Sequence, residues 1–400
     1  MKFLTSLLTI YVLSSGSLAR AEDLAITHAT VYSATEQGLL ADATVVIKDG
    51  IITAINPATL DVDRVIDAEG KILTPGLIGA MTQIGLVEIG SEGKTRDDSD
   101  GKADITFDPS LAFNGGSSLI PLARKGGLTR IIGTPKAGSR LFAGQSFIAD
   151  LTGSLTSVQA TNTGVVVSLG SPSKGSRARE LQTLIDTLDR GTKITDKPLS
   201  KKDQAVRSVL EGRKPLLIYA NRTSDILQVI ALKKRFSIKV VLIGAADAVV
   251  VKAQLTQANI PVVINPMHNL PTSFDSLHQS LRNAGLLARA GVKVVFQGVG
   301  SHYLYQLRFD AGNAVANGMP YEDALAAITA NVADVFGLNS GKIAVGKRAD
   351  LVLWQGDPLD LNSRVVTLWI DGKAYDTETR QDKLRQRYQA QSDLPKAYVK

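Results

Sequence analysis

Eight short apolar runs, separated by loops and helical segments between Pro75 and about Phe336, constrain the fold of this chain more than any other feature. Several are continuous stretches of Val, Ile and Leu, which is typical of parallel strands buried on both faces. Helical patterns follow the later runs, since Ser224 can cap a helix over Asp225–Arg235 and Pro320 can open one that ends at Gly337. The eight runs are Met81–Val87, Thr129–Thr134, Gln145–Leu151, Val165–Leu169, Leu216–Ala220, Val240–Gly244, Pro261–Pro266 and Val292–Gln297.

This alternation predicts an α/β protein with a (β/α)8 TIM barrel over residues 75–337, because such a barrel needs roughly 250 residues. Two β-rich segments with Asp-Gly hairpin turns, residues 22–74 and 338–377, flank it and predict one β-sandwich built from both chain ends. Residues 378–400 are polar and predict a surface helix or tail. A doubly wound sheet is the alternative, but the chain has no Gly-rich nucleotide-binding fingerprint.

The first 21 residues have the pattern of an export signal. Lys2 supplies a positive charge, Leu4–Leu18 is mostly apolar, and Ala19-Arg20-Ala21 is a small-x-small cleavage pattern before Glu22. The alternative, a retained membrane anchor, is disfavoured because charged and turn-forming residues follow at once, and no later run is long enough to span a bilayer. The chain has no cysteine, so an oxidising compartment poses no hazard. We therefore expect a periplasmic or secreted bacterial protein.

Charge excludes two classes of partner. The formal net charge of the 400 residues is +7, and no block of five or six basic residues occurs. A mild bias spread over this length does not indicate binding to nucleic acid or to anionic lipid.

Three segments carry motifs at consistent spacing. Residues 65–78 read VIDAEGKILTPGLI, residues 221–226 read NRTSDI, and residues 341–352 read GKIAVGKRADLV, while residues 324–331 add ALAAITAN. In this order they resemble the amidohydrolase superfamily, specifically its exported, imidazolonepropionase-like branch. The resemblance implies a barrel with a flanking sandwich, and a zinc-dependent hydrolase of carbon–nitrogen bonds other than peptide bonds.

The metal ligands of that family are missing from the corresponding positions. The resemblance implies a His-x-His at the end of strand one, a His on each of strands five and six, and an Asp on strand eight. These positions fall on Met81, Gln83, Tyr219, a residue near Gly244, and Val299 or its neighbour. Because zinc needs about three imidazole, carboxylate or thiolate ligands, this set predicts that metal-assisted hydrolysis is lost and that no cofactor is required.

Other residues could form a different site. His268 and His302 follow strands seven and eight, so they could line a pocket at the barrel mouth with Arg222 and Tyr219, or simply make ordinary loop hydrogen bonds. His278 is expected on a helix without a functional role, and His28 in the sandwich. The acidic loop with Asp97, Asp98, Asp100 and Asp104 lacks the spacing of a calcium-binding EF-hand and is expected to be solvated.

Three functions remain open from the sequence. The first is a catalytically degenerate amidohydrolase homologue that acts as a binding or partner subunit, pairing with an intact amidohydrolase paralogue or with itself. The second is an active hydrolase of cyclic or linear amides with an atypical site, which would hold zinc. The third is a periplasmic protein that binds a small molecule at the barrel mouth. We favour the first, because the residue types at the former ligand positions cannot assemble a zinc site.

Overall fold

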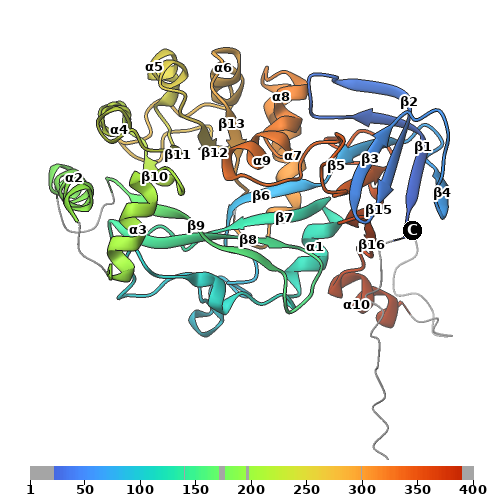
Figure 1. Ribbon diagram of the computed structural model, residues 1–400, viewed down its shortest axis with the longest axis horizontal. Helices are drawn as coiled ribbons and strands as arrows, with labels where there is room; N and C mark the ends of the chain where they lie inside the picture. Colours follow the sequence, from blue (N-terminus) through green and yellow to red (C-terminus); the bar gives the residue numbers. More distant parts are fainter. Residues whose placement is uncertain (1–21, 139, 171–175, 195–197, 299, 390–400) are drawn as a thin grey trace, which may run out of the picture.

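The computed structural model describes residues 22–138, 140–170, 176–194, 198–298 and 300–389. They form two β-sheets of eight strands each, one of them wound into a barrel with helices around it (Figure 1). The predicted α/β fold, a barrel with a separate β-structure built from both chain ends, is confirmed. The barrel strands are β6 (Leu77–Thr82), β7 (Leu128–Gly133), β8 (Phe142–Asp150), β9 (Val158–Ser168), β10 (Leu216–Ala220), β11 (Val240–Gly244), β12 (Val262–Ile264) and β13 (Val294–Phe296).

One barrel strand runs against its neighbours. The strands pair in chain order from β6 to β13, and a parallel bridge between Ala80 and Gln297 nearly closes the ring. β6–β7 and β9 to β13 pair in parallel, but β8 is antiparallel to both β7 and β9. The connections before and after β8, residues 134–141 and 151–157, are too short for the crossover of a dozen or more residues that a parallel pair requires. The barrel therefore departs from eight parallel βα units at this point.

Helices cover the barrel unevenly as a result. α1 (Leu119–Lys125) precedes β7, whereas no helix lies between β7 and β9 in the part of the chain that the structure describes. Helices follow the later strands, and Figure 1 shows them along the outer side of the barrel. They are α2 (Arg177–Lys193), α3 (Lys201–Leu210), α4 (Thr223–Phe236), α5 (Lys252–Gln257), α6 (Asn283–Arg289), α7 (Leu307–Ala316), α8 (Tyr321–Ala326) and α9 (Ala330–Phe336).

The first barrel strand lies earlier than the sequence predicts. The expected run was Met81–Val87, whereas β6 spans Leu77–Thr82 and the residues after it form a turn. Met81 has a φ of 55° and Gly85 a φ of 77°, and such left-handed backbone does not continue a strand. The apolar residues Leu86 and Val87 are buried beneath this turn rather than in the sheet.

The second sheet is built from both chain ends, as predicted, and its strands form one continuous, curled sheet. Its order is β16-β15-β14-β5-β1-β2-β3, and β4 pairs with β1 on the edge that β5 also uses. A bridge between Ile51 and Arg348 joins β3 to the segment before β14, so the sheet folds around its own apolar core. The strands are β1 (Leu24–Tyr32), β2 (Leu39–Lys48), β3 (Ile51–Ile55), β4 (Arg64–Asp67), β5 (Ile72–Pro75), β14 (Leu351–Trp354), β15 (Val365–Ile370) and β16 (Lys373–Tyr375).

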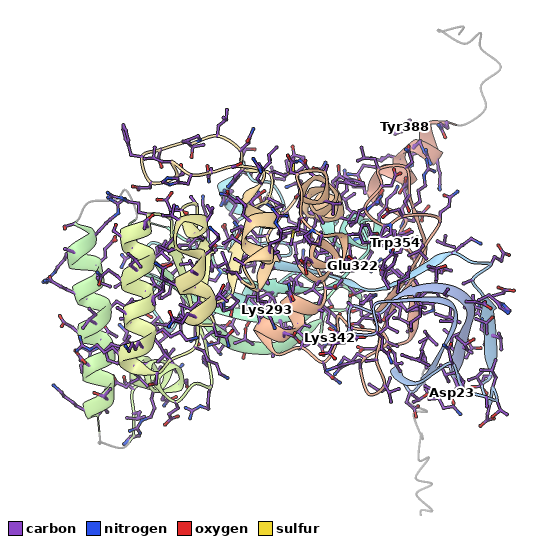
Figure 2. The ribbon with its side chains drawn as sticks, turned by 90° about the horizontal axis from the view of Figure 1, so that it is seen from above. Asp23, Lys293, Glu322, Lys342, Trp354 and Tyr388 are labelled. Carbon is purple, nitrogen blue, oxygen red and sulfur yellow. The ribbon has the colours of Figure 1, made fainter. Side chains whose placement is uncertain are left out.

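A buried ion cluster and a tryptophan join the barrel to this sheet. Arg130 of β7 is paired with Asp350, and it also donates to Asp371 at 2.8 Å. Trp354 donates from Nε1 to the Thr74 hydroxyl at 2.9 Å, and its ring fills the space beside Gly127, where a Cβ would be only 2.4 Å away. Figure 2 shows Trp354 between the barrel and the sheet that carries Asp23. These contacts fix the sheet against the barrel.

The described chain ends in α10 (Arg380–Tyr388), an exposed polar helix that is held to α1 by an ion pair between Lys125 and Asp382. Among the residues that the structure describes, no helix is long and apolar enough to cross a bilayer.

Candidate functional site

The carboxyl ends of the barrel strands, where barrel enzymes place their chemistry, carry few groups that bind metal. Met81 is buried at the end of β6 and packs its thioether into the apolar interior of the barrel. Gln83 lies two residues further on, and its Nε2 is 3.4 Å from the Thr134 carbonyl and 3.3 Å from the Thr134 hydroxyl. A thioether in an apolar core and an amide that donates to a neighbouring strand end do not supply the ligands that zinc prefers.

The positions on β10 and β11 are equally poor ligands. Tyr219 packs against the interior core, and burial raises the pKa of its phenol to about 12, so the hydroxyl keeps its proton at neutral pH. Gly244 has a φ of 80°, and a Cβ there would lie 2.7 Å from the Asn221 Oδ1. Val299 lies outside the described residues. The residues present therefore do not fit the zinc ion that the family resemblance implies.

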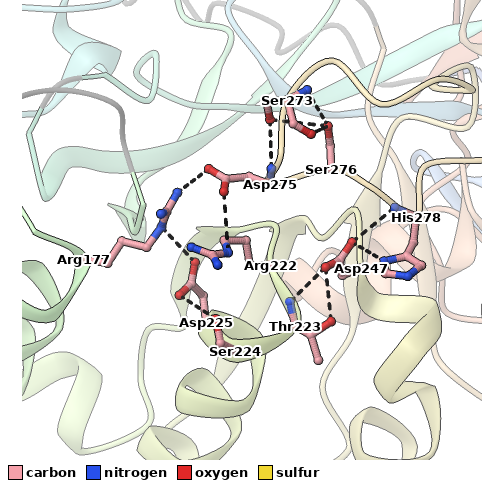
Figure 3. A network of polar contacts seen from close by, with 10 residues as sticks. All are labelled: Arg177, Arg222, Thr223, Ser224, Asp225, Asp247, Ser273, Asp275, Ser276 and His278. Atoms are coloured by element: carbon pink, nitrogen blue, oxygen red, sulfur yellow. Dashed lines mark hydrogen bonds and ion pairs between the residues drawn. The ribbon is translucent and has the colours of Figure 1, made fainter.

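A network of polar side chains lies over the same ends of β9 to β12 (Figure 3). At its centre is Asp247, which is buried three residues after β11. One carboxylate oxygen accepts from the backbone and hydroxyl of Thr223 at 3.1 and 3.2 Å, and the other accepts from His278 Nδ1 at 2.9 Å. Burial opposes ionisation of Asp247, but these hydrogen bonds outweigh it and lower the pKa of the carboxyl. The pair orients a half-exposed imidazole whose Nε2 is available for proton transfer.

Two arginines and two aspartates form the other half of the network (Figure 3). Arg177, at the start of α2, pairs with Asp275 and lies 3.3 Å from Asp225. Arg222, just before α4, lies 3.6 Å from the other Asp275 oxygen. Burial raises the pKa of Asp225 even though both guanidinium groups oppose that shift. The cluster ties the loop after β12 to helices α2 and α4 across the face of the barrel.

The two histidines that we expected at the barrel mouth, His268 and His302, lie in different loops and have different neighbours. His268 is exposed, its Nδ1 accepts from the Gln279 amide at 3.3 Å, and desolvation lowers its pKa. It borders a cavity of about 20 Å³ beside Gly244, which has room for about one water molecule. His302 is exposed in the loop after β13. Within the described ranges, no three His, Cys, Asp or Glu side chains are grouped so as to hold a metal ion.

The side chains that do come together at the mouth were not predicted from the sequence. His278 was expected on a helix without a role, but it lies in the loop after β12 and contacts Asp247 through both its backbone and its ring. Asp247 follows a barrel strand by three residues, and that position was the signal available for it. Asp275 gave no sequence signal, because its loop is brought to Arg177 by the fold alone. Arg222 lies just before α4 and is 3.6 Å from Asp275.

Part of the chain matches a known protein family. Residues 225–376 match the model of the Amidohydrolase family. Among curated proteins, "Amidohydrolase tasK" from Hapsidospora irregularis is 42% identical over 67 residues, which is 16% of this chain and 7% of that protein. The match therefore covers a small part of that much longer relative.

Solved structures match over nearly the whole chain. An amidohydrolase from Thermotoga maritima MSB8 superposes with a TM-score of 0.79 and 24% identity, covering 88% of this chain and 99% of that one. Molinate hydrolase has a TM-score of 0.57 at 17% identity, covering 95% and 99%. Enamidase, described as a member of the amidohydrolase superfamily, has a TM-score of 0.52 at 16% identity, covering 90% and 97%. A segment of the chain therefore matches the Amidohydrolase family, and the chain shares its fold with solved amidohydrolase structures.

Proposed function

We propose that this protein is a catalytically degenerate member of the superfamily, which has lost metal-dependent hydrolysis and acts as a binding or partner subunit. The observation that carries the proposal is the chemistry at four former ligand positions: a buried thioether, an engaged amide, a protonated phenol and a glycine. The loss of one ligand could be repaired by a neighbour, but four together leave an ion without a coordination shell. The partner that we propose is an intact amidohydrolase paralogue or a second copy of this chain.

The loop after β12 supports a partner at the barrel mouth. Between Asn265 and Arg282 it presents the apolar side chains Leu270 and Phe274, which are 72% and 89% exposed, together with the less exposed Met267 and Leu277. Large apolar side chains gathered on one exposed loop are typical of interaction surfaces. The ion pairs of Asp275 hold the loop against the barrel, so this surface is presented in a fixed position.

Co-purification tests the partner role. The tagged full chain, expressed in its native host, should recover an intact amidohydrolase paralogue or a second, untagged copy at a fixed ratio. Replacing Leu270 and Phe274 with Ser should abolish that recovery. Leu155→Ser is the matched control, because Leu155 is 90% exposed in the β8–β9 turn at the opposite end of the barrel. A monomer that recovers neither partner, or recovery that survives the loop changes, would contradict the proposal.

A second candidate is a hydrolase of cyclic or linear amides that works without a metal. The Asp247–His278 pair favours it, because a carboxylate on Nδ1 orients an imidazole as a general base. Such an activity would resist chelators and would fall about 10²- to 10⁴-fold in His278→Ala. We rank it second, since the cavity beside Gly244 is of water size. The same cavity is too small for the third candidate, a small molecule bound beside His268.

We also infer that the protein is exported and acts in the periplasm or outside the cell. This rests on the sequence pattern of residues 1–21, which lie outside the described residues. Fractionation of the host tests it: recovery of the protein solely from the cytoplasm would contradict export.

A further inference from the structure

A large cavity lies on the flank of the barrel, away from the mouth. It has a volume of about 930 Å³, is open to solvent on one side, and is bordered by the loop of residues 96–112, the β8–β9 hairpin and α3. Within the described ranges no helix lies between β7 and β9, and a loop with the short helix η2 (Pro109–Ala112) covers β8 instead, which leaves room for the cavity. Ligand sites in proteins commonly have volumes of about 300–1,000 Å³, so the cavity is large enough for a small organic molecule.

One wall of the cavity carries a buried amide and an ammonium group. Gln145 of β8 is 6% exposed, and its Oε1 accepts from the Lys214 ammonium at 2.8 Å. This contact engages the amide oxygen, and Gln145 borders the cavity, so Nε2 is the remaining donor of that side chain. Burial lowers the pKa of Lys214, and the carboxylate of Asp108, which also borders the cavity, opposes that shift by favouring the ammonium form.

The opposite wall is acidic and rigidly attached. Asp97 and Asp100 are exposed on the loop that borders the cavity. We expected this loop to be solvated, but Asp98 between them is buried and paired with Arg96 at 2.8 Å, which anchors the loop. Asp104 then pairs with Lys202 of α3 at 2.8 Å and has a pKa of about 2, because this ion pair and Thr106 outweigh the effect of burial. The two walls are therefore held at a fixed separation.

Apolar groups complete the lining. Phe107 and Leu111 border the cavity between the two charged walls, and Leu111 is almost fully exposed. The Phe107 carbonyl accepts from the Gln145 backbone at 2.8 Å, so the apolar part is joined directly to the buried amide. The lining thus combines a cationic donor wall, an acidic wall and an apolar surface between them.

We propose that this flank cavity binds a small zwitterion with an apolar side chain, of the amino-acid or dipeptide class. Its carboxylate accepts from Gln145 Nε2 and Lys214, its ammonium group lies toward Asp97 and Asp100, and its apolar side chain packs against Leu111. The site is separate from the barrel mouth, and the inference does not depend on the function proposed there.

Calorimetric titration of the full mature chain with L-alanyl-L-leucine tests the proposal. We expect saturable binding, weakened at least tenfold when the peptide is N-acetylated or when its carboxylate is amidated. Gln145→Glu keeps the shape of the side chain and can pair with Lys214, but it replaces the amide donor with a negative charge, so binding should fall at least tenfold. Gln254→Glu, on the exposed face of α5, is the matched control and should bind as the parent does.

Three results would overturn the inference. One is the absence of binding heat when the folded parent is titrated with millimolar dipeptide. Another is unchanged affinity in both folded Gln145→Glu and Lys214→Met, which would place the ligand elsewhere. The third is equally tight, competing binding of inorganic phosphate, which would make the cavity a simple anion site. Thermal unfolding of each variant confirms that the protein compared is folded.

Discussion

The variant Gly244→Ala tests whether the backbone at the end of β11 can accept a side chain, such as a ligand histidine, without strain. The residue has a φ of 80°, and a side chain in this left-handed region costs about 1–2 kcal/mol. Its Cβ would also meet the Asn221 Oδ1 at 2.7 Å, and moving that amide would give up its hydrogen bond from the Ala246 backbone, worth about 0.5–1.5 kcal/mol. We therefore expect a strain of roughly 2–3 kcal/mol.

The matched control is Gly90→Ala, because Gly90 has an ordinary φ and open space around its Cβ. Both changes remove the same unfolded-state freedom, worth about 0.4–1 kcal/mol, so the difference between the two variants isolates the strain. Urea denaturation gives both unfolding free energies. If Gly244→Ala is as stable as Gly90→Ala within about 0.5 kcal/mol, the reasoning is refuted, and a histidine at position 244 would be equally acceptable to the backbone.

Three further predictions concern stability and processing. Arg130→Met leaves the buried Asp350 carboxylate unpaired and should cost about 3–5 kcal/mol, whereas Arg235→Met, in an exposed pair, should cost less than about 1 kcal/mol; equal losses on denaturation would contradict this. Burial raises the pKa of Asp310 to about 6, so the folded state keeps a proton that the unfolded chain releases near pH 4. Stability should therefore fall by up to about 3 kcal/mol between about pH 4 and 6 and stay flat above. Asp310→Asn should remove that fall, and parallel pH profiles for the two proteins would count against it. Mass spectrometry of the secreted chain should show Glu22 as its first residue, and an intact Met1 would disprove cleavage.

The strands that the sequence predicts best are those buried on both faces. Leu216–Ala220 and Val240–Gly244 have the predicted bounds, because an uninterrupted apolar run allows no other register. The predicted range of β6 was too late in the sequence because the turn after the strand is also apolar. The left-handed backbone at Met81, which the sequence does not show, marks where the strand ends. The reversed direction of β8 could have been predicted from its short connections.

Less of the candidate site than of the fold could be predicted from the sequence. The motifs locate the ends of the barrel strands in the sequence. The prediction that zinc ligands are missing there needs only the residue types at those positions. The pairing of Asp247 with His278 joins residues 31 apart across an irregular loop, and no periodic pattern encodes where such a loop folds back. The flank cavity was equally hidden, since it lies where no helix occurs between β7 and β9 among the described residues.

The zinc content of the purified mature protein tests the central claim most directly. The protein is loaded with excess zinc, dialysed without chelator and analysed by plasma mass spectrometry, beside an intact amidohydrolase treated in the same way. Because a thioether, an amide, a neutral phenol and a glycine stand at the former ligand positions, we expect zinc far below one ion per chain. One tightly held zinc per folded chain, retained after dialysis, would contradict the account.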